Sequence, residues 1–111
     1  MSLKSLLIDD GPTDFYDASF RSTLEDLMLS LRQSKRLTPV SVTPIQGVVY
    51  EGDLFGLLQD LRVPAHLHWV TMRINNYASP YDYSQDKLLL YVPNDSELES
   101  IRQSWRTRQK K

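Results

Sequence analysis

The sequence has no cysteine, no long apolar run and almost no net charge. Without cysteine the chain has no disulfide, no thiolate metal ligand and no cysteine nucleophile. A net charge of −1 gives no general attraction to nucleic acid or to anionic lipid. No apolar run approaches the roughly 20 residues that a membrane span requires, and we expect no secretion signal at the start. We therefore expect neither nucleic acid nor membrane among the partners.

What is present is the composition of a soluble globular protein, 41% apolar and 24% charged. With 111 residues the chain is long enough for one core and too short for two ordinary domains. A domain of this size buries about two-thirds of the surface that its extended chain exposes, so its stability is modest. A permanent partner would add to that stability.

Charges of opposite sign are concentrated at the two ends of the chain. The acidic start and the basic end consist of Asp9, Asp10, Asp14 and Asp17, and of Arg102, Arg106, Arg108, Lys110 and Lys111. Two interpretations are open: the charged ends are simply solvated, or they contact the oppositely charged ends of neighbouring subunits.

The first part of the chain, residues 1–47, is predicted to hold an arm, a helix and an extended strand. Residues 1–14 are rich in turn formers and predict an arm or loop. Apolar residues at helical spacing, from Phe20 to Leu31, predict a helix that begins at Asp17 or Ser19 and ends near residue 33. Residues 37–45 alternate as in a strand, but Pro39 and Pro44 restrict it to an edge.

The middle part, residues 48–93, is predicted to form a β-α-α-β unit. Residues 48–50 form a strand that can pair with residues 37–45 as a hairpin. Asp53 caps a helix over residues 54–61, and Pro64 precedes a second helix that ends near Asn75. A tyrosine-rich loop over residues 77–87 leads to a strand over 88–92, which Pro93 ends.

Residues 94–111 are predicted to form a capped helix with a basic tail, in which Leu98, Ile101 and Trp105 recur at helical spacing. Asn94, Asp95 or Ser96 supplies the cap. The three parts make one compact domain of the α+β class.

The middle part resembles a LysM module. The matching residues are Tyr50, Gly52, Asp53, Leu54, Leu67 and Asn75, followed by Leu90, Tyr91, Val92 and Pro93. The resemblance implies a small binding or docking unit. Carbohydrate-binding LysM modules usually carry threonine or serine after the Gly-Asp pair, and this chain has Leu54 there.

Residues 67–82 are similar to a pattern in baseplate wedge proteins of contractile-tailed bacteriophages, in which an apolar helix opened by an aromatic pair ends in Asn. The resemblance implies a non-enzymatic structural adaptor that joins neighbouring baseplate or tail proteins. It also implies a virion location, in the tail baseplate, after assembly in the host cytoplasm. The alternative is a peptidoglycan-binding LysM module of a cell-wall or lysis machine.

The residues that bear chemistry do not form a recognisable catalytic set. His66 and His68 are two residues apart, which is the wrong spacing for one metal ion on a helix. Gly52 and Gly56 lack the companions of a phosphate-binding loop. The carboxylates Asp53, Asp60, Asp82 and Asp86 could supply an acid-base pair for glycan hydrolysis, but Asp53 has a capping role. We expect no enzyme, no cofactor and no metal site.

Partner contact is expected at tyrosine, tryptophan and arginine, which dominate interface hot spots. The candidate partner-binding residues are Trp69, Arg73, Tyr77, Tyr81, Tyr83, Trp105 and Arg106. For Trp69 a purely core position is the stronger interpretation, whereas the loop tyrosines favour contact. Tyr50, Gly52, Asp53, Asn75 and Pro93 are expected to be structural.

Overall fold

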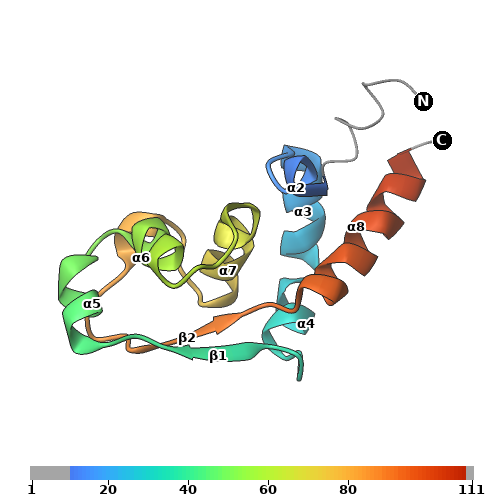
Figure 1. Ribbon diagram of the computed structural model, residues 1–111. Helices are drawn as coiled ribbons and strands as arrows, with labels where there is room; N and C mark the ends of the chain where they lie inside the picture. The colour runs from blue at the N-terminus through green and yellow to red at the C-terminus, as the bar shows by residue number, and fades with distance from the viewer. Residues whose placement is uncertain (1–10, 110–111) are drawn as a thin grey trace.

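The computed structural model describes residues 11–109, which form a mixed α+β fold (Figure 1). In chain order the elements are α2 (Gly11–Asp14), α3 (Ala18–Asp26), α4 (Met28–Arg32), β1 (Thr38–Ser41), α5 (Pro44–Val49), α6 (Leu54–Asp60), η1 (Ala65–Leu67), α7 (His68–Ile74), η2 (Pro80–Asp82), β2 (Leu89–Val92) and α8 (Asp95–Gln109). None of the described helices is long and apolar enough to cross a membrane.

A two-stranded antiparallel sheet joins two segments that are about fifty residues apart in sequence. β1 pairs with β2 in a register that runs from Thr38 opposite Val92 to Ser41 opposite Leu89. The Val42 amide continues the ladder by donating to the Leu88 carbonyl at 2.9 Å. Because hydrogen-bonded pairs alternate along such a ladder, the nitrogen of Pro39 faces away from β2 and costs no ladder bond. The edge strand and the strand over 88–92 are confirmed in shortened form.

The strand expected at residues 48–50 is wrong, because residues 44–49 form helix α5. The hairpin with residues 37–45 is wrong for the same reason, since β1 pairs with β2. Thr43 and Gln46 form a capping box and Pro44 opens the helix, and these local signals outweigh the β preference of Val48 and Val49. The domain boundary expected at 47/48 falls inside this helix.

The two central helices are confirmed. Asp53 caps α6, with its Oδ1 accepting from the Gly56 amide at 3.0 Å. Arg62 takes a left-handed φ of 66° after α6, and the chain then enters η1 and α7 beyond Pro64. The turn is closed by the Val63 amide, which donates to the Leu58 carbonyl at 2.9 Å.

The N-terminal helix is broken into two pieces rather than continuous from residue 17 to 33. Asp17 caps α3 through its side chain, and the helix ends at Leu27, where α4 begins. The break lets α3 pack against α8 while α4 packs against α7. Of the arm expected at residues 1–14, the last four residues form α2, and residues 1–10 lie outside the described part of the chain.

The hydrophobic core lies between the inner face of the sheet and the helices. Its fully buried members include Phe20, Leu24, Leu54, Leu57, Leu58, Val70, Tyr83, Leu90 and Leu98. The last helix supplies Leu98 and Trp105 from one face, and the Asn94 side chain caps its first turn by accepting from the Glu97 amide at 2.9 Å. The predicted C-terminal helix and its cap are therefore confirmed.

Candidate docking surfaces

Helix α5 presents its apolar face to solvent. Ile45, Val48 and Val49 occupy positions i, i+3 and i+4, and their side chains are 76%, 60% and 65% exposed. This spacing normally marks the face that packs into a core. Here the buried side of the helix is Gly47 instead. We call the row of Ile45, Val48 and Val49 the α5 ridge.

The backbone of α5 is held in place by polar contacts and by close packing. Thr43 and Gln46 exchange hydrogen bonds of 3.0 and 3.1 Å, and the Gln46 amide nitrogen donates to Asp60 at 3.0 Å. A Cβ at Gly47 would lie only 3.2 Å from the Gln85 carbonyl oxygen and 3.3 Å from a Leu88 methyl. Glycine therefore lets the helix pack closely against residues 85–88, which precede β2. This packing leaves the opposite side of the helix, the ridge, facing outward.

Three acidic residues lie close to helix α5 in the structure. Glu51 follows the helix, Asp60 is bonded to it through Gln46, and Asp86 adjoins the residue that packs on Gly47. All three side chains are exposed, as is the neighbouring Lys87. The ridge is thus an apolar surface with Glu51 and Asp60 nearby, whereas Asp86 adjoins the Gly47 side of the helix.

Asn75, expected to be structural, connects α7 to the outer edge of β2. Its Nδ2 donates to the carbonyls of Thr71 and Tyr91, and its Oδ1 accepts from the Tyr91 amide at 2.9 Å. The side-chain amide thereby pairs with the strand as a neighbouring strand would. This contact blocks the β2 edge at its centre.

The tyrosine-rich loop packs directly on the turn before α6. The Gly52 amide donates to the Tyr83 carbonyl at 2.9 Å, and the Gln85 amide donates to Glu51 at 2.7 Å. Gly52 has a φ of +71°, which suits glycine. A glycan groove between the start of α6 and the segment after Asn75 would have to occupy the space that these contacts fill.

Two of the expected partner-binding residues belong to the core. Tyr83 is 1% exposed and its hydroxyl donates to the Lys87 carbonyl at 2.8 Å, while burial raises its pKa. Trp105 packs against Phe20 with ring centroids 5.1 Å apart. Tyr83 offers no surface to a partner in this conformation, and Trp105 offers only the small part of its side chain that lines the groove between α3 and α8 described below.

The other loop tyrosines differ in exposure. Tyr77 is half-buried and packs edge to face against Tyr83 at 6.2 Å, and burial raises its pKa. Tyr81 is 81% exposed, on the short helix η2 that Ser79 and Asp82 cap. Tyr81 alone among the three loop tyrosines has a freely accessible ring.

Trp69 and Arg73 lie where α7 meets α3. The Arg21 guanidinium stacks on Trp69 at 5.0 Å and approaches Tyr16 at 5.7 Å. Arg73 forms an ion pair with Glu25 and donates to the Tyr77 carbonyl at 2.8 Å. The hydrogen bond from Arg73 lowers the pKa of Glu25 against the effect of burial. Both residues thus take part in helix packing while remaining partly exposed.

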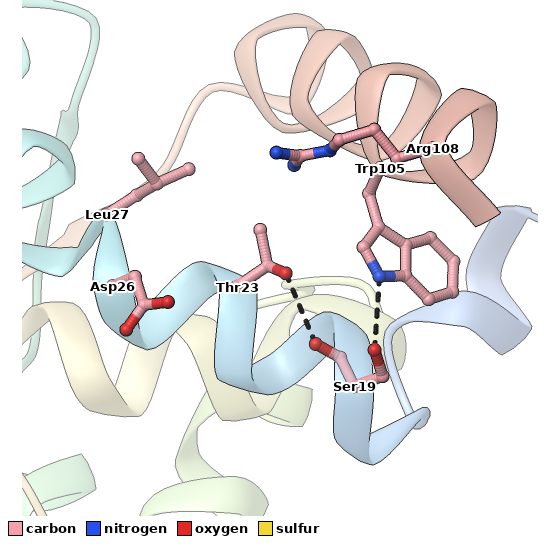
Figure 2. Close-up of a pocket in the computed structure, with 6 residues that line it drawn as sticks. All are labelled: Ser19, Thr23, Asp26, Leu27, Trp105 and Arg108. Atoms are coloured by element: carbon pink, nitrogen blue, oxygen red, sulfur yellow. Dashed lines mark hydrogen bonds between the residues drawn. The ribbon is translucent and has the colours of Figure 1, made fainter. Parts of the chain in front are cut away.

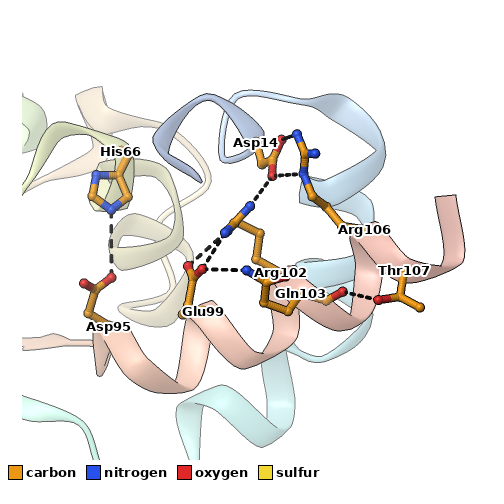
Figure 3. Close-up of polar contacts among 8 residues, drawn as sticks. All are labelled: Asp14, His66, Asp95, Glu99, Arg102, Gln103, Arg106 and Thr107. Atoms are coloured by element: carbon orange, nitrogen blue, oxygen red, sulfur yellow. Dashed lines mark hydrogen bonds and ion pairs between the residues drawn. The ribbon is translucent and has the colours of Figure 1, made fainter. Parts of the chain in front are cut away.

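Arg106, also expected to bind a partner, belongs to an ion-pair network that ties α2 to α8 (Figure 3). Asp14 accepts from Arg102 at 2.8 Å and from Arg106 at 2.8 and 3.2 Å, and Arg102 also pairs with Glu99. Burial alone would raise the pKa of Asp14, but the hydrogen bonds from Arg106 and Arg102 hold it below its usual value. The hydrogen bond to Glu99 raises the pKa of the buried Arg102 against the effect of burial.

A groove of about 390 Å³ separates α3 from the second half of α8 (Figure 2). Its lining comprises Ser19, Thr23, Asp26, Leu27, Trp105 and Arg108. In Figure 2 the Trp105 indole forms one wall and donates to the Ser19 hydroxyl at 3.4 Å, while Arg108 extends over the opening toward Leu27. Sequence reasoning missed this groove, because its two walls come from opposite ends of the chain.

The two histidines lie in structural contacts. His68 Nε2 is 2.8 Å from the Val63 carbonyl, and His66 packs against the Phe15 ring at 5.0 Å. Across the described residues 11–109, no group of three or more His, Asp or Glu side chains is arranged to hold a metal ion.

No family model, no curated protein and no solved structure matches the chain.

Proposed function

We propose that this protein is a non-enzymatic structural adaptor that docks onto other proteins through the α5 ridge. The observation that carries the proposal is the outward apolar face of α5, which is held in place by the capping box and by the packing of Gly47 against Gln85 and Leu88. An exposed apolar row on a rigid helix is typical of a protein contact surface. Covering Ile45, Val48 and Val49 would contribute on the order of 4 kcal/mol to association.

The assembly we propose is the tail baseplate of a contractile-tailed bacteriophage, as the sequence resemblance implies. If the fold is interpreted as LysM-like, β1 is the first strand of the β-α-α-β unit, and α6, α7 and β2 are its other elements. Asp53 and Asn75 support this assignment, because each fixes the start or end of an element through its side chain. The ionisable groups with shifted pKa values are engaged in ion pairs or packing, which supports a structural role.

Incorporation into particles tests this function. The exposed Val48 is replaced by aspartate, and Leu29, which is 68% exposed on α4, is replaced by aspartate as a matched control. Circular dichroism establishes that each variant folds. The wild-type chain and Leu29→Asp should enter tail particles that are made in a host without the native copy, and Val48→Asp should not.

Quantitative mass spectrometry of purified particles gives the readout. Incorporation of Val48→Asp at the wild-type level would contradict docking through the ridge. Absence of the wild-type chain from the particles would contradict the baseplate setting.

Peptidoglycan binding is the second candidate, and the exposed ring of Tyr81 favours it. An accessible tyrosine beside a Gly-Asp helix start is able to stack on a sugar ring. The filled space between the α6 start and the 77–87 loop weighs against a groove for the glycan. Sedimentation with insoluble peptidoglycan that is lost in Tyr81→Ala would favour this candidate, whereas protein that stays in the supernatant would eliminate it.

A further inference from the structure

We propose that the α5 ridge of one copy docks into the groove between α3 and α8 of a second copy, so that the chain associates head to tail. This inference rests on the proposed function, since it names another copy of the chain as one neighbour of the adaptor. It joins two features that the fold leaves uncovered among the described residues, an apolar ridge and a groove of about 390 Å³.

The two surfaces have complementary shapes. The ridge projects three aliphatic side chains from one short rigid helix. The groove is bounded by the apolar side chains of Leu27 and Trp105, with the methyl group of Thr23 at its base (Figure 2). Branched aliphatic side chains that enter such a groove exchange water for apolar contact on both partners.

The charges at the two surfaces are complementary as well. Arg108 extends over the groove without an ion pair to another described residue, and the acidic residues Glu51 and Asp60 lie near the ridge. Asp26 at the groove can face Lys87 beside the ridge. Pairing of one α5 ridge with another would instead bring acidic residues of the two copies together, which disfavours a ridge-to-ridge contact.

The ridge and the groove lie at opposite ends of the molecule (Figure 1). A ridge therefore cannot occupy the groove of its own chain. The contact joins unlike surfaces, so its repetition from copy to copy yields a ring or an open string, whereas a wild type that stops at a dimer would indicate two reciprocal contacts and would overturn the head-to-tail arrangement.

Complementation between two single variants tests this arrangement. Val48→Asp disables the ridge and leaves the groove intact, and Leu27→Asp disables the groove rim and leaves the ridge intact. Leu29→Asp serves as the control for an added exposed carboxylate. Sedimentation velocity is measured at concentrations up to about 1 mM. Circular dichroism establishes that each variant keeps its fold.

The wild type and Leu29→Asp should gain mass with concentration beyond a dimer. Each disabled variant alone should stay monomeric, and the equimolar mixture of the two should form a dimer and nothing larger. A monomeric wild type across the range, or a mixture that fails to dimerise, overturns the proposal. If that happens while the wild-type chain still enters particles through its ridge, the adaptor function stands and only the identity of the neighbour falls.

Cysteine cross-linking gives a second measurement, since the chain contains no cysteine of its own. Thr23→Cys and Val48→Cys chains of different tag length are mixed under mild oxidation. The mixed disulfide should exceed that of Thr23→Cys with Leu29→Cys by roughly tenfold, because docking raises the local thiol concentration. Adding Arg108→Glu should lower the yield several-fold, and an unchanged yield would overturn the proposed orientation.

Discussion

Replacement of Asp14 by asparagine removes the charge at the centre of the network between α2 and α8. The carboxylate is 10% exposed and accepts three hydrogen bonds from Arg102 and Arg106. Breaking a buried ion pair costs about 3–5 kcal/mol when the remaining charge has no other partner. Arg102 keeps Glu99 and Arg106 is partly exposed, so we expect a smaller loss of about 2 kcal/mol in the free energy of unfolding.

Urea unfolding followed by circular dichroism measures this loss. With a denaturant slope of about 2 kcal/mol/M, the midpoint should fall by about 1 M. Asp26→Asn is the matched control, because Asp26 is exposed on α3, and it should leave the midpoint unchanged. A loss below about 0.5 kcal/mol in Asp14→Asn would refute the reasoning, since it would assign the network no more energy than a surface pair.

The same variant has a predicted pH dependence. The pKa of Asp14 is lower in the folded chain than its ordinary value of 3.8, so the unfolded state takes up a proton first on acidification. The contribution of Asp14 is therefore present at neutral pH and is lost as the pH falls through and below that value. The stability of the wild type should drop more steeply in this acid range than that of Asp14→Asn, and parallel curves would contradict the assignment.

Three further substitutions test other contacts. Because burial raises the pKa of Tyr83 above 10.0, wild-type stability should decline as the pH rises beyond that value, and Tyr83→Phe should decline less in urea titrations at pH 9 and 11. Asn75→Ala removes both hydrogen bonds to the Tyr91 backbone, so it should lower the free energy of unfolding by about 1–3 kcal/mol and speed amide exchange at Tyr91. Unchanged exchange would contradict the contact between Asn75 and β2. Gly47→Val should cost about 1–3 kcal/mol in urea unfolding because its side chain has no room, and a neutral result would show that α5 does not sit as described.

The elements predicted correctly are those with strong local signals. Asp53 before an apolar run identified α6, Pro64 marked the start of the next helical segment, and Asn94 capped α8 as one of three candidates. In each case a side chain or a proline acts within four residues of itself. Sequence alone is sufficient for such features because no distant contact decides them.

Helix α5 was missed although a local signal was present. Thr43, Pro44 and Gln46 form a capping box with proline at the first helical position, but Val48, Val49 and Tyr50 read as a strand. The outward ridge was missed with the helix, since a face is defined only once the helix is assigned. A correct reading of the capping box would have placed Ile45, Val48 and Val49 in one row.

The burial of Trp105 could be predicted from the sequence, whereas the burial of Tyr83 could not. Trp105 shares helical spacing with Leu98 and Ile101, so its place on the packed face of α8 was readable from the sequence. Tyr83 lies in a loop without periodicity, and only its contacts with Gly52 and Lys87 bring it inside. In this loop Tyr83 is a core residue, whereas Tyr81 is exposed, and the sequence does not distinguish the two.

The opposite charges at the chain ends illustrate how a fold redistributes a sequence pattern. Solvation and contact with neighbours were the two expectations, yet Asp14 meets Arg102 and Arg106 within the same chain. These ion pairs engage Asp14, Arg102 and Arg106 where α2 meets α8. Arg108 remains extended over the groove, far from α5 (Figures 1 and 2). The described residues thus carry unlike charges at the two ends of the fold, one beside the α5 ridge and the other beside the groove. In the proposed head-to-tail contact a second copy would bring these unlike charges together, whereas a contact between two α5 ridges would bring like charges together.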